Sequence, residues 1–216
     1  MTRDIVTEIL VCYRKGLFPM SDGREDDNVY LVEPKHRALL PIADFHVSRR
    51  LKETLRARHY EITINQDFAS VIANCAKSKK TRESTWINHP IENLFNMLHA
   101  QGHAHSVEYR EKGILKGGVY GLAVGQIFCA ESMYSDVSNA SKIALIHMAA
   151  RLWKAGFQLW DVQFMNPHLE QFGAFEIPQE KYLLQLGQFK DQPADFTVSH
   201  LNVDEEDLLK LYLDNR

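Results

Sequence analysis

A run of strand-like segments followed by a long amphipathic helix constrains the fold of this chain most strongly. The three strand-like segments are separated only by short, glycine-containing turns and lie at 103–110, 114–123 and 126–132. Residues 139–156 then have the apolar periodicity of a helix that Gly156 closes, and an apolar strand is predicted over 158–164. An antiparallel meander, a long helix and a further strand together predict an α+β fold.

The residues before position 36 have the features of a small separate unit. A helix is predicted over 4–15, where apolar residues recur at helical spacing, and Gly16 ends it. Phe18-Pro19 is expected to open a loop, and the polar stretch 21–28 is rich in turn residues. We therefore expect a small amino-terminal domain over 1–35 and a larger domain over 36–216.

Further elements are expected around the meander. Apolar periodicity predicts helices over 49–58, 67–76 and 90–101, a short helix begun near Asn166 and an amphipathic tail helix within 204–215. Alternating residues predict a strand over 60–64, and short strands are predicted at 30–32 and 38–40.

Composition limits the class of protein. No apolar run of the 216 residues approaches the about 18–20 residues that cross a bilayer, and the amino terminus lacks the apolar centre of a signal peptide. The three cysteines are isolated, so neither a disulfide framework nor a cysteine zinc site is expected. These features fit a reducing cytoplasm.

Charge is distributed unevenly along the chain. A net charge of −3 argues against a protein that coats nucleic acid indiscriminately. Residues 49–58, however, carry five basic side chains against the single acidic residue Glu53. Such a helix either presents an ordinary solvated face or binds the phosphates of one polyanion.

Two clusters have some features of ligand sites but are expected to be structural. His99, His103 and His105 are close in sequence, but a metal site needs converging ligands with supporting carboxylates, and only Glu108 follows them. The glycine-rich stretch 116–121 lacks the spacing of a phosphate loop, and glycines within a strand more often mark a bulge or a close approach of another backbone.

Three polar residues end or interrupt apolar strands. Asp161 and Gln163 are two residues apart, so period-2 geometry directs both side chains to one face, where they can touch each other and a common ligand. The alternative is a strand end whose polar groups satisfy nearby backbone. Glu131 lies among apolar residues and needs either a structural cation or a cationic group of a substrate.

Several short motifs in one order carry a family resemblance. They are Tyr13-Arg14-Lys15-Gly16-Leu17-Phe18-Pro19, Phe45-His46-Val47-Ser48-Arg49, Thr85-Trp86-Ile87, His103-Ala104-His105-Ser106-Val107-Glu108, Gly117-Gly118-Val119-Tyr120-Gly121, Glu131-Ser132-Met133-Tyr134-Ser135, Asn139-Ala140-Ser141-Lys142, Asp161-Val162-Gln163, His168-Leu169, Gly173-Ala174 and Glu176-Ile177-Pro178. Over about residues 10–187 the chain resembles the leucyl/phenylalanyl-tRNA–protein transferases. These bacterial enzymes move an amino acid from aminoacyl-tRNA to the amino terminus of a protein.

The resemblance implies a GNAT-like acyltransferase domain behind the small amino-terminal domain. Relatives of that fold that use acetyl-CoA have a glycine-containing pyrophosphate loop where the long helix begins, whereas this helix begins with Ser138-Asn139-Ala140-Ser141. The donor is therefore expected to be an aminoacyl ester on RNA. Since such an ester is already activated, no cofactor, ATP or metal is expected.

The resemblance also assigns catalytic roles. Asp161 and Gln163 match the catalytic pair, in which the Asp polarises the Gln. Because an amide is a very weak base, we expect Gln163 to orient the amine and stabilise the oxyanion. Proton transfer through the terminal ribose hydroxyl stays an alternative. Glu131 matches a carboxylate that meets the Arg or Lys at the amino terminus of the acceptor protein, which is thereby marked for N-degron degradation.

Further residues are assigned to substrates. Ser132 and Asn166 are expected at the substrate site, together with an apolar pocket for the side chain of Leu, Phe or Met formed by Phe128, Met133, Leu145, Met148, Leu152 and Trp160. The terminal adenosine of the tRNA is expected between Tyr13, Met20 and Trp86, and Met20 stands where many relatives have Trp. The acceptor stem is expected against Arg49, Lys52, Arg56 and Arg58.

Two other functions are compatible with such a fold. One is a GNAT acetyltransferase that uses acyl-CoA, and the other is a non-catalytic RNA-binding relative. The presence of Asp161, Gln163 and Glu131 together disfavours the non-catalytic one. A monomer is expected, because the sequence has no long exposed apolar stripe.

Overall fold

The centre of the protein is a seven-stranded mixed sheet. The computed structural model describes residues 4–77, 84–198 and 203–215. The strands follow the order β4-β5-β6-β7-β8-β3-β9 across the sheet. Their bounds are β3 His36–Leu40, β4 Glu61–Ile64, β5 Ala104–Glu111, β6 Ile114–Val124, β7 Ile127–Ser135, β8 Leu159–Gln163 and β9 Phe175–Pro178.

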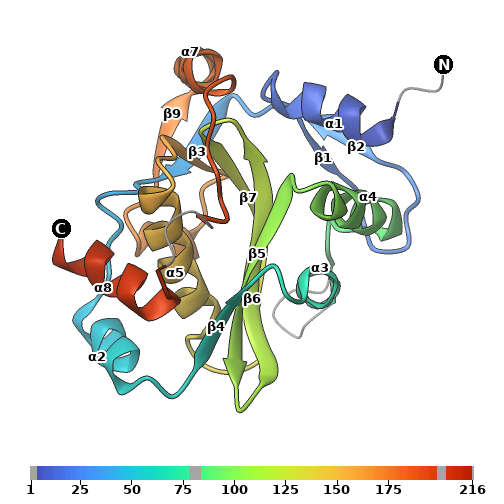
Figure 1. Cartoon of the computed structure of the whole chain (residues 1–216). Helices are drawn as coiled ribbons and strands as arrows, with labels where there is room; N and C mark the ends of the chain where they lie inside the picture. Colours follow the sequence, from blue (N-terminus) through green and yellow to red (C-terminus); the bar gives the residue numbers. More distant parts are fainter. Residues whose placement is uncertain (1–3, 78–83, 199–202, 216) are drawn as a thin grey trace.

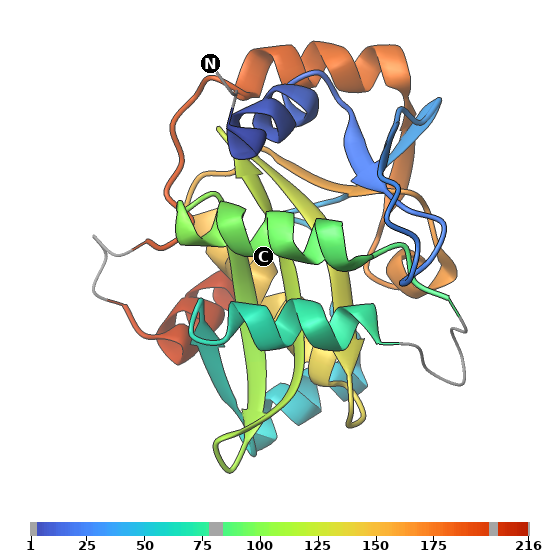
Figure 2. The same cartoon turned by 90° about the vertical axis from the view of Figure 1, so that its right-hand side faces the viewer.

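Helices cover both faces of this sheet (Figures 1 and 2). One face packs against α5 (Ala140–Lys154), which in turn contacts α8 (Glu205–Asp214), with α2 (Arg49–Ala57) beside it. The other face carries α3 (Phe68–Ala76) and α4 (His89–Ala100), and α1 (Ile5–Tyr13) packs on α4. Two separate hydrophobic clusters fill the two sides of the sheet.

The predicted meander and crossover helix are confirmed. Strands β5, β6 and β7 pair antiparallel, and the chain returns through α5 to β8, which pairs parallel to β7. This is the GNAT-like α+β arrangement predicted from the sequence. The parallel ladder ends where Cys129 lies opposite Asp161, although β7 continues to Ser135. Beyond this point the two strands part.

A β-bulge lies at the same place on β7. Tyr120 pairs with Ser132 and Gly121 pairs with Ala130, so Glu131 is the additional residue. A Cβ atom at Gly121 would collide with the carbonyl oxygen of Cys129, and only glycine fits there. The glycines of this strand therefore permit close packing, as predicted. The bulge also changes the direction of the Glu131 side chain, because an extra residue breaks the regular alternation of faces.

The amino-terminal residues form a small unit of their own strands. Strands β1 (Phe18–Met20) and β2 (Tyr30–Val32) make a two-stranded antiparallel sheet. The expectation of a loop at Phe18-Pro19 was wrong, because pairing with β2 holds these residues extended, and such an edge position tolerates Pro. Val6 and Phe18 belong to the same hydrophobic cluster as residues of β6 and β7. A domain boundary at residue 35 stays a prediction.

The carboxyl-terminal region adds two helices to the domain. The strand β9 and the helix α7 (Gln179–Phe189) were not predicted, whereas α8 confirms the expected tail helix. Asp204 caps α8, and the Tyr212 hydroxyl donates to the carbonyl oxygen of Ile42. Within the described part of the chain, no helix is both long and apolar enough to cross a membrane.

Candidate active site

Asp161 is the most deeply buried acid beside the gap between β7 and β8, and it forms an ion pair with Arg37. Both side chains are almost fully buried, at 0% and 2% exposure. The Arg37 guanidinium donates through Nε at 2.9 Å to one carboxylate oxygen of Asp161 and through a terminal nitrogen at 2.6 Å to the other. The Tyr182 hydroxyl also donates to Asp161, at 2.8 Å. Burial opposes the charge on Arg37, but the adjacent carboxylate raises the pKa of Arg37 above its ordinary value.

Asp161 fixes Gln163 through the backbone. The Gln163 N–H donates to Asp161 at 2.9 Å, and Gln163 has a φ of 58°, in the left-handed region that residues other than glycine rarely adopt. Among the contacts of the described residues, Asp161 meets this N–H and not the side-chain amide of Gln163. The geometry therefore shows no direct polarisation of the amide by Asp161; instead, Asp161 holds the turn that directs the amide.

Glu131 lies opposite Gln163 across the gap. Its Oε1 accepts the hydroxyl of Tyr13 at 2.8 Å and the side-chain N–H of Gln163 at 3.3 Å. No salt bridge reaches Glu131 from the described residues, so the structural cation, one of the two alternatives for this residue, is not seen there. Burial raises the pKa of Glu131 to about 8, against the opposing effect of the hydrogen bond from Tyr13.

Two cavities meet at this gap. The first, which we call the apolar cavity, has a volume of about 180 Å³ and is lined by Val119, Ala130, Glu131, Ser132, Met133, Leu145, Val162, Asn166 and Leu169. The second, which we call the aromatic cavity, has a volume of about 190 Å³ and is lined by Phe18, Met20, Trp86, Glu131, Val162, Gln163, Phe164 and Asn166. The residues common to both are Glu131, Val162 and Asn166.

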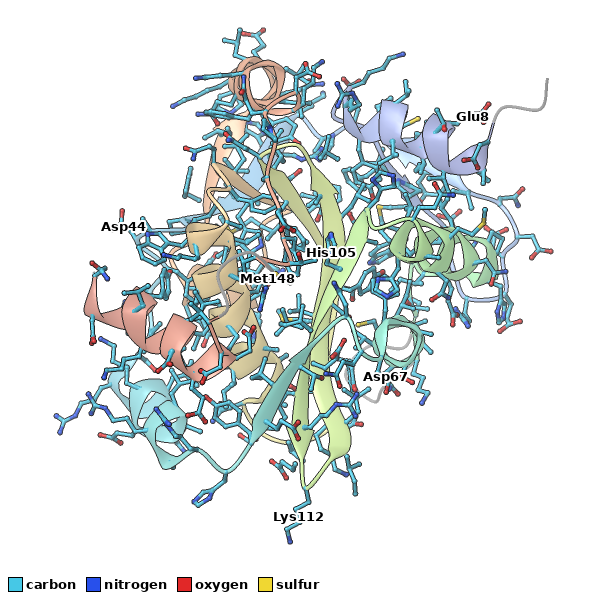
Figure 3. The ribbon with its side chains drawn as sticks, viewed as in Figure 1. Glu8, Asp44, Asp67, His105, Lys112 and Met148 are labelled. Carbon is cyan, nitrogen blue, oxygen red and sulfur yellow. The ribbon has the colours of Figure 1, made fainter. Side chains whose placement is uncertain are left out.

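The structure divides the predicted pocket residues into two groups. Five of them line the apolar cavity, namely Glu131, Ser132, Met133, Leu145 and Asn166. The other four are core residues with at most 1% exposure and line neither cavity, namely Phe128, Met148, Leu152 and Trp160. Figure 3 shows Met148 on α5, in the interior of the molecule.

Aromatic stacking explains why two of these residues lie in the core. The ring of Trp160 stacks on Phe45 with centroids 5.3 Å apart, and Phe128 stacks on Phe196 at 5.1 Å. Three further lining residues, Val119, Val162 and Leu169, were not predicted, and Ala130 completes the wall. Of these three, only Val162 had a signal in the sequence, because it lies between Asp161 and Gln163.

The residues predicted to hold the adenosine are also divided. Met20 and Trp86 line the aromatic cavity, together with Phe18 and Phe164, which were not predicted. Tyr13 is only 1% exposed and does not line this cavity, because its hydroxyl is directed at Glu131. Tyr13 is thus placed to support the carboxyl group rather than to stack on a base.

No residue of the basic helix α2 lines either cavity, and the helix lies beside α8 (Figure 1). Arg49 is 95% exposed and pairs with Glu53 within the helix. Arg58 pairs with Glu206 of α8. A cavity of about 420 Å³ between the two helices is lined by Lys52, Arg56 and Arg58, but also by the acidic residues Glu206 and Asp214. The tail helix therefore offsets part of the positive charge that the sequence predicted here.

The histidine cluster has structural contacts. His99 stacks on Phe68 at 4.3 Å, and His105 stacks on Phe196 at 4.4 Å and contacts Asn65. Burial lowers the pKa of His105 to about 4. In the described ranges, no three His, Cys, Asp or Glu side chains gather closely enough to hold a metal ion.

These features define a class of protein. The sheet has two parallel strands that part beside two neighbouring cavities with shared lining residues, an arrangement that can hold a small substrate. A sequence model of the leucyl/phenylalanyl-tRNA protein transferase family matches residues 39–187. The chain belongs to this family, so the predicted resemblance is confirmed and the protein is an aminoacyltransferase.

Curated proteins named leucyl/phenylalanyl-tRNA–protein transferase are similar over most of their length. The protein from Phenylobacterium zucineum is 48% identical over 189 residues, which cover 88% of this chain and 86% of that protein. The proteins from Maricaulis maris and Caulobacter vibrioides are 46% and 44% identical over 191 residues, which cover 88% of each chain.

Two solved structures have a more distant likeness. A ribosomal-protein-alanine N-acetyltransferase from Brucella melitensis biovar Abortus matches 47% of this chain and 76% of its own, with 15% identity and a TM-score of 0.33. The carboxyl-terminal domain of a putative lysylphosphatidylglycerol synthetase from Agrobacterium fabrum matches 84% of this chain and 57% of its own, with 14% identity and a TM-score of 0.38. Both scores are too low to support a conclusion.

The buried ion pair leads to a stability prediction. We expect Asp161→Asn to lower the free energy of unfolding by about 3–5 kcal/mol, because the buried Arg37 charge loses its partner. The control is Asp191→Asn, which removes an exposed partner of Arg14 and should change stability by less than about 1 kcal/mol. Urea unfolding of the three proteins measures both effects. Equal midpoints for the two variants would contradict a supporting role for the pair.

Proposed function

We propose that this protein transfers Leu or Phe, with Met as a further donor, from aminoacyl-tRNA to the amino-terminal Arg or Lys of acceptor proteins. The modified protein then enters N-degron degradation. The observation that supports this proposal best is the junction of the apolar and the aromatic cavity at Glu131, Val162 and Asn166. The donor also has two parts, an amino-acid side chain and an adenosine joined by an ester, and each part can occupy one of the two cavities.

The donor is expected to occupy the two cavities with its ester between them. The apolar cavity, with Met133 and Leu145 on its wall, suits the side chain of Leu, Phe or Met, which gains free energy from leaving water. The aromatic cavity offers the ring of Trp86 and the thioether of Met20 to the terminal adenine. The ester carbonyl then lies at the shared wall.

The reaction is the aminolysis of an ester. A neutral α-amine attacks the carbonyl carbon, and the developing oxyanion needs hydrogen-bond donors. The Oδ1 atom of Asn166 accepts the N–H of Leu169, so the amide nitrogen of Asn166 is the end that can donate to the oxyanion. Gln163 orients the amine, and Asp161 keeps Gln163 in place. The ester supplies the driving force, so neither ATP nor a metal or cofactor takes part.

The acceptor stem of the tRNA is expected against α2, in a complex with one copy of the protein. Lys52 and Arg56 supply charges for phosphates, whereas Arg58 is shared with Glu206. Because such contacts release counterions, tRNA binding should weaken as salt increases.

A transfer assay tests this function directly. We expect labelled Leu and Phe to pass from tRNA to peptides that begin with Arg or Lys, and not to the same peptides with an acetylated amino terminus, which lack a nucleophile. Acetyl-CoA should give no free thiol with the same peptides. Measurable tRNA binding without any transfer, or thiol release instead of aminoacyl transfer, would contradict the proposal.

The apolar cavity leads to a prediction for donor choice. Leu145→Phe narrows the cavity, so kcat/KM for the Phe donor should fall about tenfold more than kcat/KM for the Leu donor. Leu211→Phe, the same substitution at an exposed position on α8, is the control and should leave the ratio of the two donors unchanged. An equal fall for both donors would mean that the side chain binds elsewhere.

A further inference from the structure

We propose that Glu131 is the proton acceptor of the transfer reaction, taking a proton from the attacking amine and returning it to the leaving ribose oxygen. This inference rests on the proposed function and adds the group that moves the proton. The resemblance assigns Glu131 to a cationic group of the acceptor protein instead, and the two roles predict different kinetics.

The position of Glu131 supports the proposal first. If the amino-acid side chain occupies the apolar cavity and the adenosine occupies the aromatic cavity, the ester that joins them lies beside the residues that line both cavities. Those residues are Glu131, Val162 and Asn166, and among these three Glu131 alone has a titratable side chain. Asp161 lines neither cavity and is 0% exposed, so it cannot reach the reacting atoms.

The carboxyl group is also held in a fixed direction. The bulge in β7 directs Glu131 into the gap, and its Oε1 accepts hydrogen bonds from Tyr13 and Gln163. Tyr13 is 1% exposed and packs in the hydrophobic cluster on this side of the sheet. No described residue donates to Oε2, which leaves this oxygen to accept a proton from an amine held by Gln163.

The surrounding charges leave Glu131 without a neutralising cation. Arg37, on β3, is already bound to Asp161 on β8, to which Tyr182 on α7 also donates. Tyr13 on α1 and Cys129 on β7 are further titratable groups that face this region. Burial, followed in size by the opposing Tyr13 hydrogen bond and then by the Asp161 charge, sets the pKa of Glu131 at about 8. A terminal α-amine also has a pKa of about 8. Glu131 therefore exchanges a proton near neutral pH, which is the range in which a general base is most effective.

The reaction then balances with no other reagent. The amine nitrogen forms a bond to the ester carbonyl carbon, and its extra proton passes to the Glu131 carboxylate. The bond between that carbon and the ribose oxygen breaks, and the proton passes from Glu131 to this oxygen. The products are a peptide bond and a free ribose hydroxyl, and Glu131 is a carboxylate again.

Glu131→Gln tests the proposal because it keeps the size of the side chain and an oxygen for Tyr13, but cannot accept the proton. We expect single-turnover transfer at saturating peptide to fall by about 10²–10⁴-fold, with the Kd for tRNA nearly unchanged. The rate of the unmodified protein should rise with pH through an inflection, since the carboxylate is the active form. In Glu131→Gln, the part of this rise that comes from the titration of Glu131 should be absent, and only the part that comes from the peptide amine should remain.

A second variant separates the titration of Glu131 from that of the substrate. Tyr13→Phe removes a hydrogen bond that favours the carboxylate, so the inflection should move to higher pH, whereas the pKa of the free peptide amine is the same for every variant. The controls are Tyr109→Phe and Glu111→Gln, which alter another tyrosine–glutamate hydrogen bond, of 2.9 Å, that lies outside both cavities. Both controls should keep the profile of the unmodified protein.

Each other outcome overturns the proposal in a distinct way. If Glu131→Gln raises KM for Arg and Lys peptides but keeps kcat, Glu131 binds the cationic side chain. If it keeps both constants, while a 2′-deoxy terminal adenosine abolishes transfer, the ribose hydroxyl moves the proton. If the unmodified protein itself transfers no amino acid, the proposed function fails as well.

Discussion

The buried ion pair between Arg37 and Asp161 is the interaction on which the site depends. It joins β3 to β8, and Tyr182 adds α7 to the same carboxylate. Arg37 also donates at 2.9 Å to the carbonyl oxygen of Gly16, so the amino-terminal segment is tied to this point too. A buried pair of charges is favourable only when its remaining donors and acceptors are satisfied, and here the polar neighbours do so. Asp161 thus holds β3, α7 and the backbone of Gln163 in fixed relative positions.

The same arrangement gives the two carboxyl groups of the site different properties. Asp161 has a full set of donors, including a guanidinium, whereas Glu131 has a hydroxyl and an amide and no cation among the described residues. Two acids in contrasting surroundings are a common basis for distinct roles at neutral pH. Both acids lie beside the gap between β7 and β8, because the parallel pairing of these strands ends where Cys129 lies opposite Asp161.

Local patterns predicted most of the elements, although not β1, β9 or α7, and the resemblance predicted the region of the candidate site. The turns of the meander, the periodicity of the long helix and the polar end of β8 are short-range signals, so they could be read from the sequence. The sequence could not show which of the predicted pocket residues line a cavity and which fill the core. Whether Phe128 and Trp160 line a pocket or fill the core depends on Phe196 and Phe45, which are distant in sequence. Tyr13 likewise lies 118 positions from Glu131, and no local pattern indicates their hydrogen bond.

The most direct measurement is a crystal structure of the protein with phenylalanyl-adenosine in which an amide replaces the ester. The expected result is a phenyl ring beside Leu145 in the apolar cavity, an adenine on Trp86, and the amide linkage within hydrogen-bond distance of Glu131. An adenosine in the cavity between α2 and α8, or a linkage that Glu131 does not reach, would contradict the two-cavity site and the role of Glu131 together.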